Sequence, residues 1–183
     1  MHPYQIKHAA HIIKRGGVVA APTEAVFGLS CDPLDSEAVS RILQLKQRPA
    51  SKGLILIASD TRQLEPFVDN TDILKQSSIQ ESWPGPVTWL VPANPDVPAW
   101  LTGNHDTIAV RVTDHPVMSR LCEECGHALV STSANGAGQD PARNALQTRR
   151  IFGDALDWIL HADTGGNTQV SEIREAISGN VVR

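Results

Sequence analysis

Three cations fall within seven residues, at Lys46, Arg48 and Lys52, immediately before an apolar run. An arginine donates hydrogen bonds as a planar fork and a lysine acts as a point charge, and both suit phosphate groups. Cations also occur at the C-terminal end of a helix simply because they complement the helix dipole. The segment therefore indicates either a phosphate clamp or an ordinary helix end.

A second group of polar residues follows the apolar run at 128–130 and includes Ser131, Ser133 and Asn135, with glycines after them. Hydroxyls and backbone N–H groups in such a loop can bind phosphate. The segment contains neither a Walker motif nor a G-x-G-x-x-G motif. Serine and asparagine are also common in turns for local reasons, so the loop alone is a weak signal.

Two further positions carry polar groups that could bind a ligand. Thr23 and Glu24 follow an apolar strand predicted at 18–21, where their side chains would emerge at a sheet end. The alternative is a threonine N-cap with an acidic residue in the first helical turn. Arg111 lies within an alternating strand predicted at 107–113, and if its face is covered it requires an anion. That anion is either a protein carboxylate or a ligand carboxylate, unless the arginine lies on an exposed sheet face.

The cysteines and histidines do not form a recognisable metal or nucleophile motif. Cys122 and Cys125 have C-x-x-C spacing, but no second pair follows, and both lie on a predicted amphipathic helix. We expect them to be structural, and we expect no tightly bound transition metal. The sequence has no G-x-S-x-G, so it does not support a serine hydrolase.

Alternating strands and helices must position these residues, and they predict a layered α/β or α+β sheet within one domain, residues 1–183. The predicted helices cover 5–15, a segment from Asp35 or Ser36 to before Pro49, 71–82, 116–125 and 144–152. The predicted strands cover 18–21, 54–58, 87–91, 107–113, 128–132 and 157–160, with a last segment at 171–182.

Composition excludes several classes of protein. Hydrophobic residues make up 41% and charged residues 20% of the chain, which fits a globular protein rather than a disordered one. The net charge of −4 argues against nucleic acid as a partner for the whole surface, although a local basic cleft remains compatible with it. There is no apolar run of membrane-spanning or signal-peptide length, so we expect a cytoplasmic protein with no membrane partner.

Taken in order, several motifs resemble the YrdC/TsaC family of threonylcarbamoyl-AMP synthases, in its short bacterial form. These are PTEAVFGL at 22–29, LKQRP and KGLILIA at 45–58, WPGPVTWL at 83–90, AVRVTDHP at 109–116, STSAN at 131–135 and SEIR at 171–174. The resemblance implies a twisted mixed sheet flanked by helices, with a large open cleft. It also implies the synthesis of threonylcarbamoyl-AMP and pyrophosphate from L-threonine, bicarbonate and ATP, for modification of tRNA beside the anticodon.

The resemblance further implies roles for individual residues. The ATP site would contain Lys46, Arg48, Lys52, Ser131, Ser133, Asn135, Arg143 and the terminal Arg183, with Lys46 and Arg48 as the catalytic cations. The threonine site would contain Thr23, Arg111 and Ser171, with Arg111 facing the threonine carboxylate. Mg²⁺ would be held mainly through the phosphates of ATP. Proteins that transfer the threonylcarbamoyl group to tRNA would act downstream.

Two other functions compete with this one. The first is a non-catalytic module that binds double-stranded RNA or tRNA in a basic-lined cleft, although few aromatic residues are available for stacking. The second is carbamoyl-AMP formation from carbamoyl phosphate, as in the related domain of hydrogenase-maturation proteins. Those proteins are longer and carry zinc-finger-like cysteine sets that this sequence lacks.

Overall fold

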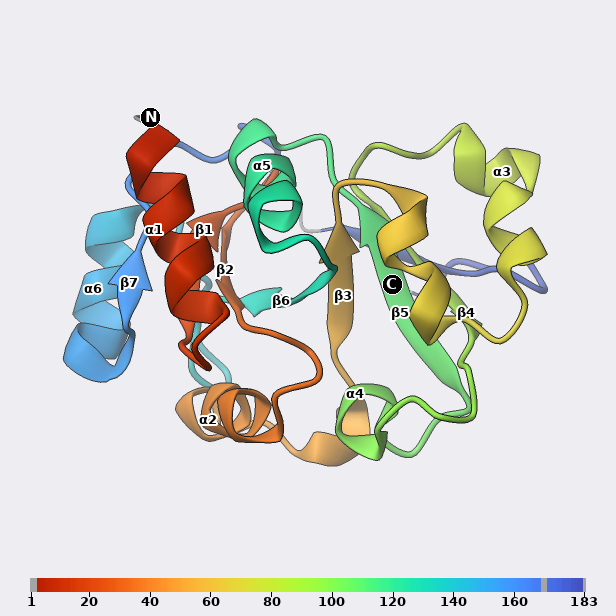
Figure 1. Cartoon of the computed structure of the whole chain (residues 1–183), viewed down its shortest axis with the longest axis horizontal. Helices are drawn as coiled ribbons and strands as arrows, with labels where there is room; N and C mark the ends of the chain where they lie inside the picture. Colours follow the sequence, from red (N-terminus) through yellow and green to blue (C-terminus); the bar gives the residue numbers. More distant parts are fainter. Residues whose placement is uncertain (1–2, 169–170, 183) are drawn as a thin grey trace.

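The computed structural model describes residues 3–168 and 171–182 and is built around one mixed sheet (Figure 1). The strand order is β7-β1-β2-β6-β3-β5-β4-β8. The strands are β1 (Val19–Pro22), β2 (Phe27–Ser30), β3 (Ile55–Ala58), β4 (Val87–Pro92), β5 (Thr107–Val112), β6 (Leu129–Ser133), β7 (Trp158–Ile159) and β8 (Glu172–Glu175). Parallel pairs (β1–β7, β3–β5, β4–β8) and antiparallel pairs occur together, which confirms the predicted mixed α/β sheet.

Six α-helices and five short 3₁₀ helices connect the strands in the described part of the chain. The α-helices are α1 (Pro3–Ile13), α2 (Ser36–Lys46), α3 (Ser77–Gln80), α4 (Ala99–Thr102), α5 (Pro116–Cys125) and α6 (Ala145–Phe152). The 3₁₀ helices are η1 (Ala50–Lys52), η2 (Thr61–Gln63), η3 (Glu65–Phe67), η4 (Thr71–Lys75) and η5 (Gly153–Ala155).

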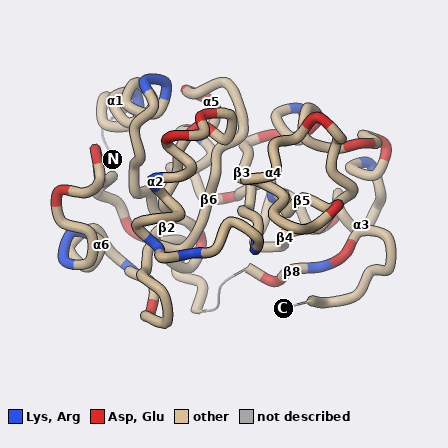
Figure 2. Tube along the Cα trace, turned by 90° about the horizontal axis from the view of Figure 1, so that it is seen from below, with Lys and Arg blue, Asp and Glu red and all other residues tan. Residues whose placement is uncertain are grey.

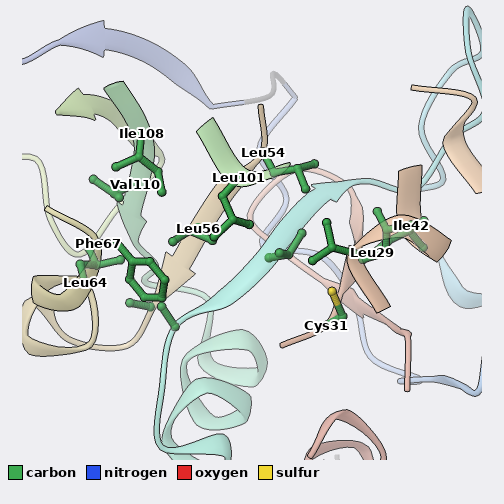
Figure 3. Close-up of a cluster of buried hydrophobic side chains, with 14 of the residues drawn as sticks. Leu29, Cys31, Ile42, Leu54, Leu56, Leu64, Phe67, Leu101, Ile108 and Val110 are labelled. Atoms are coloured by element: carbon green, nitrogen blue, oxygen red, sulfur yellow. The ribbon is translucent and has the colours of Figure 1, made fainter. Parts of the chain in front are cut away.

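Two hydrophobic clusters cover the sheet. Helices α1 and α5 lie together in Figure 1 and pack Ile13, Met118 and Leu121 against strand residues that include Val19 and Leu129. The larger cluster joins α2, α4 and the 3₁₀ segments to the other strand side chains, and Figure 3 shows its centre around Leu29, Ile42, Leu56, Leu101 and Ile108. The sheet is thus covered by apolar packing from two sets of elements, and polar side chains gather at strand ends.

Local sequence signals explain several element boundaries. Asp35 caps α2 by accepting hydrogen bonds from the backbone N–H groups of Glu37 and Ala38. The same helix ends at Gln47, whose φ of 50° places it in the left-handed region two residues before Pro49. Helix α5 has the predicted bounds, beginning at Pro116 and ending before Gly126.

The helix predicted at 71–82 is wrong, because the chain there forms η4 and the short α3. Gln76, with ψ of 139°, is extended and separates the two turns. Only Leu74 and Ile79 are buried in these two segments, and a spacing of five residues does not place two side chains on one helical face. The segment therefore lacks the continuous apolar face that would hold one long helix against the core.

The sequence prediction also missed strand β2 and assigned Thr23 a helical alternative. All four residues of β2 are buried, so this short strand shows no alternation of polar and apolar residues. Residues 23–26 form the turn of a hairpin in which Pro22 pairs with Phe27. Thr23 is therefore a hairpin residue, and the helix N-cap alternative is wrong.

The chain between β7 and β8 connects opposite edges of the sheet. We call its described part, residues 160–168, the crossing segment. Its Gly165 N–H donates to the carbonyl of Thr23 at 3.0 Å, and its Asn167 N–H donates to the carbonyl of Glu24 at 2.9 Å. A Cβ at Gly165 would lie 3.0 Å from the Cα of Glu24, so the close approach favours glycine. Figure 2 shows α6 at the left of the molecule and β8 in its right half.

Candidate functional site

One pocket brings together side chains that are distant in the sequence. The hairpin turn supplies Thr23 and Glu24, and β5 supplies Arg111. The rest of the lining includes Arg48, Leu54, Ile55, Pro86, Ser131, Thr132, Ser133 and Ser171. The predicted threonine residues and part of the predicted nucleotide residues therefore share one pocket.

Arg111 and Glu24 form a buried ion pair in this pocket. Arg111 Nη1 lies 3.3 Å from Glu24 Oε2, and the two side chains are 8% and 5% exposed. Of the alternatives for Arg111, the exposed sheet face is wrong and a protein carboxylate is present. An ion pair this deeply buried is costly to break from one side, since the remaining charge loses its partner.

Glu24 is held ionised by its neighbours. Burial by itself would raise its pKa, but the charge of Arg111 and a hydrogen bond from Thr113 outweigh burial and lower the pKa of Glu24 below its ordinary value. The Thr113 hydroxyl donates to Glu24 Oε1 at 2.5 Å and accepts from the backbone N–H of His115 at 3.1 Å. The orientation of Glu24 is thus fixed by β5 and the residues that follow it.

Two hydroxyls complete the side of the pocket that contains Arg111 and Glu24. Thr23 Oγ1 donates to the carbonyl of Val26 at 2.8 Å, which tightens the hairpin turn. Ser171 Oγ accepts from Thr88 Oγ1 at 3.1 Å, across 83 residues of sequence. This contact attaches the start of β8 to β4 at the pocket.

On the other side of the pocket, Lys46 holds the loop after β6. Its Nζ donates to the Ser133 carbonyl, to the Asn135 carbonyl at 3.1 Å and to Asn135 Oδ1 at 2.9 Å. Ser133 Oγ also donates to Asn135 Oδ1, at 2.7 Å. Burial, with a smaller contribution from Arg48, lowers the pKa of Lys46 to about 8. The ammonium thus joins the predicted cationic stretch to the predicted nucleotide loop.

The other two cations of the stretch are more accessible. Arg48 is half-buried and donates from Nη2 to the carbonyl of Gly53 at 2.9 Å. Lys52 is exposed at the end of η1 and is not part of the pocket lining. Of the predicted nucleotide residues, Arg48, Ser131 and Ser133 therefore line the pocket.

One predicted nucleotide residue lies apart from this group, and another is not described by the structure. Arg143 is exposed, and its Nη2 donates to the carbonyl of Thr168 at 3.2 Å, outside the pocket lining. Arg183 lies outside the described residues. The roles of both residues remain predictions.

Glu24 is the residue whose role sequence reasoning left out. It was named only as the carboxylate beside Thr23, with no assigned function. A buried Arg111 requires an anion as its partner, and this requirement is the signal that could have identified Glu24. Glu24 is an acidic residue in the other motif that is predicted at a sheet end. Sequence alone does not show that the two motifs face each other.

The cysteine pair lies away from the pocket. Cys122 and Cys125 are both buried in the hydrophobic cluster beneath α1 and α5, and Cys122 Sγ lies 3.5 Å from the carbonyl of Ile57. Burial raises the pKa of both thiols, that of Cys125 to about 12. Within residues 3–168 and 171–182, no group of three His, Cys, Asp or Glu residues could hold a metal ion.

With this geometry established, comparison with known proteins decides the family. Residues 11–183 match the Sua5/YciO/YrdC family model, described as telomere recombination. The chain belongs to the Sua5/YciO/YrdC family. The resemblance to YrdC/TsaC proteins is thereby confirmed.

Members of the Sua5/YciO/YrdC family resemble the chain over almost its whole length. Threonylcarbamoyl-AMP synthase from Cellvibrio japonicus is 50% identical, covering 98% of this chain and 95% of its own. The protein of the same name from Nitrosococcus oceani is 53% identical, covering 98% and 97%.

Solved structures of the Sua5/YciO/YrdC family share the fold. Sua5 of P. abyssi, crystallised with L-threonine, superposes with a TM-score of 0.89 at 31% identity, over 96% of this chain and 52% of that one. YciO of E. coli has a TM-score of 0.84 at 25% identity, over 100% and 89%. Among the described residues, no helix has the length and apolar character needed to cross a bilayer.

Proposed function

We propose that the chain synthesises threonylcarbamoyl-AMP and pyrophosphate from L-threonine, bicarbonate and ATP. The observation that carries the proposal is the set of side chains that line the pocket described above. A buried arginine–carboxylate pair (Arg111 and Glu24) lies in the same lining as a phosphate-compatible group (Arg48, Ser131 and Ser133). The relatives named threonylcarbamoyl-AMP synthase, about half identical over nearly the full chain, support the same conclusion.

The amino-acid side of the pocket suits threonine. The Arg111 guanidinium would bind the carboxylate as a fork, with Glu24 holding the guanidinium in place. The hydroxyls of Thr23 and Ser171 would contact polar groups of the substrate. Burial of these groups favours selectivity, because a ligand that left them unpaired would be rejected.

The nucleotide side suits a triphosphate. Arg48 and the hydroxyls of Ser131 and Ser133 would meet the phosphates, with Lys46 maintaining the loop and adding charge. Lys52 would approach from η1 when the substrate is present. ATP would enter with Mg²⁺ held by its own phosphates and by water.

The reaction requires the protein to position its substrates rather than to form a covalent bond with them. The amine of threonine and bicarbonate give a carbamate and water. A carbamate oxygen then attacks the α-phosphate of ATP, the bond between the α- and β-phosphates breaks, and pyrophosphate leaves. Such a step needs no protein nucleophile. The protein accelerates it by holding the reactants in line and by placing cations near the negative charge of the phosphates. The product would be passed, in the cytoplasm, to proteins that modify tRNA.

Pyrophosphate release tests this function. Purified protein with MgATP should release pyrophosphate only when L-threonine and bicarbonate are both present. Pyrophosphate release that occurs without threonine or without bicarbonate would contradict carbamate adenylation. No release under any combination, together with salt-dependent retention of double-stranded RNA, would favour the binding-module function instead.

A further inference from the structure

The proposed reaction must dispose of a proton in a buried site. A threonine ammonium and bicarbonate yield the carbamate, one water molecule and one proton. The amine is protonated near neutral pH, because an α-amino group ordinarily has a pKa of about 8. A group beside the amine must therefore accept the proton and pass it to solvent.

Glu24 lies between the substrate pocket and a second hollow. It lines the pocket with Thr23 and Arg111, and it also lines a hollow of 220 Å³ with Asp114, His115, Pro116, Gly165 and Asn167. This hollow has room for several water molecules, since one occupies about 30 Å³ in the liquid. The Glu24 side chain, only 5% exposed, thus separates the threonine site from a wetted space.

The two oxygens of Glu24 have different surroundings. Oε1 accepts the Thr113 hydroxyl, whose own acceptor site is taken by the His115 N–H. Oε2 is buried beside Arg111 and accepts no hydrogen bond from any residue in the described ranges. Oε2 therefore has hydrogen-bonding capacity left beside its ion pair with Arg111, and a donor on a bound substrate could use it.

Asp114 continues the path outward from Glu24. Its side chain is exposed to solvent and lines the second hollow. Partial burial, a hydrogen bond shared with Glu24 and the charge of Glu24 all raise the pKa of Asp114 above its ordinary value. Glu24 and Asp114 thus line the same hollow, and the outer of the two carboxyl groups is exposed to solvent.

We propose that the Glu24–Asp114 carboxyl pair is the proton outlet of the threonine site. The threonine ammonium gives one proton to the carboxyl pair, and the electron pair left on nitrogen forms the bond to the bicarbonate carbon. A second N–H proton moves to the bicarbonate hydroxyl, the bond between that oxygen and carbon breaks, and water leaves. The pair then releases that proton to water in the second hollow from Asp114. This inference rests on the proposed function.

Other charged groups around the pair favour outward transfer. Arg111 faces Glu24 from β5 and keeps it ionised when the site is empty. His115 follows Asp114, is 4% exposed, and burial lowers its pKa, so the ring is neutral near pH 7. Its Nε2 lies 3.1 Å from the carbonyl of Asp163 in the crossing segment. A neutral ring there leaves Asp114 as the ionisable group at the mouth of the hollow.

The test is Asp114→Asn, which removes the outer carboxyl without touching substrate. We expect kcat for pyrophosphate release to fall about tenfold to a hundredfold, with the KM values for threonine and ATP nearly unchanged. Added imidazole or acetate should restore the rate in proportion to its concentration, because a small base can take the proton from the hollow. Asp114→Glu, which keeps a carboxyl, should retain most of the activity.

Matched measurements separate this inference from the proposed function. Asp163→Asn removes an equal charge from the nearby crossing segment and should behave like the parent protein. If the parent protein releases no pyrophosphate, the proposed function itself is wrong. If the parent protein is active and Asp114→Asn has an unchanged kcat, the proton outlet is wrong while the proposed function stands. The same conclusion follows if added base does not restore the kcat lost in Asp114→Asn.

Discussion

The two sides of the pocket stabilise their charges in different ways. On the amino-acid side, Arg111 and Glu24 are almost fully buried and neutralise each other. On the nucleotide side, Arg48 is half-buried, Lys52 is exposed, and the contacts of Lys46 and Arg48 are mainly with carbonyl and amide oxygens. A buried ion pair fixes geometry before the substrate arrives, whereas cations on uncharged oxygens keep their charge available for an incoming anion. Under the proposed function, the amino-acid side would therefore provide selectivity and the nucleotide side would provide charge.

The largest expected effect comes from breaking the buried pair. Arg111→Ala leaves Glu24 buried without its counter-ion, and we expect a loss of about 3–5 kcal/mol of stability together with loss of threonine use. Arg111→Lys keeps the charge but not the fork, so it should fold and raise the KM for threonine much more than that for ATP. Thermal unfolding and steady-state kinetics measure the two effects. Equal losses for threonine and ATP in Arg111→Lys would erase the proposed difference between the two sides.

Removing a cation from the nucleotide side should affect ATP use without unfolding the protein. For Arg48→Ala we expect kcat/KM for ATP to fall at least about tenfold, since a charge-assisted hydrogen bond contributes about 1.5–3 kcal/mol. Lys46→Ala should be at least as damaging, because it also releases the loop at 133–135. Lys75→Ala, an exposed cation remote from the pocket lining, is the matched control. Near-normal turnover in both pocket variants would reject the phosphate clamp.

A smaller effect should appear in the pH dependence of ATP use. The pKa of Lys46 is about 8, so its ammonium loses its proton as the pH rises through that value. A neutral amine attracts phosphate less, and the KM for ATP should therefore increase between about pH 7 and 9. Lys46→Arg stays charged over this range and should flatten the profile. An identical rise in both proteins would assign the dependence to another group.

The smallest effect on activity is expected outside the pocket. Cys122→Ser with Cys125→Ser changes the hydrophobic cluster under α1 and α5 and should leave turnover largely intact. The cost should appear as lower stability, on the order of 1–3 kcal/mol, because polar groups enter an apolar site. Activity at low temperature and a melting curve distinguish the two outcomes. Inactivation accompanied by release of a metal would show that the pair has a chemical role.

Sequence patterns predicted much of the fold because the strongly periodic segments are also the well-packed ones. Helix α5 and strand β5 carry regular apolar repeats and appear at the expected positions. Strand β2 is buried over its whole length and gives no periodic signal, and the segment around Gln76 lacks the continuous apolar face of one long helix.

In the candidate site, the sequence likewise predicted some features and not others. The residues Thr23, Arg48, Arg111 and Ser131 belong to separate sequence motifs, Ser171 is indicated only by the family resemblance, and the fold places all five in one pocket lining. The pairing of Arg111 with Glu24, and the capture of the 133–135 loop by Lys46, depend on contacts across 87 residues. Such contacts follow from the strand order, which no single motif encodes.

The crossing segment also has a consequence for the order in which the molecule forms. The strands before and after it, β7 and β8, lie at opposite edges of the sheet, and Ser171 reaches Thr88 only after residues far apart in synthesis have met. Contacts between distant parts of a chain form slowly, because closure entropy is lost before they stabilise anything. A nascent chain halted before residue 171 could assemble most of its hydrophobic core yet lack one wall of the pocket. Catalytic competence would then be acquired last, so that a growing polypeptide still on the ribosome consumes no ATP.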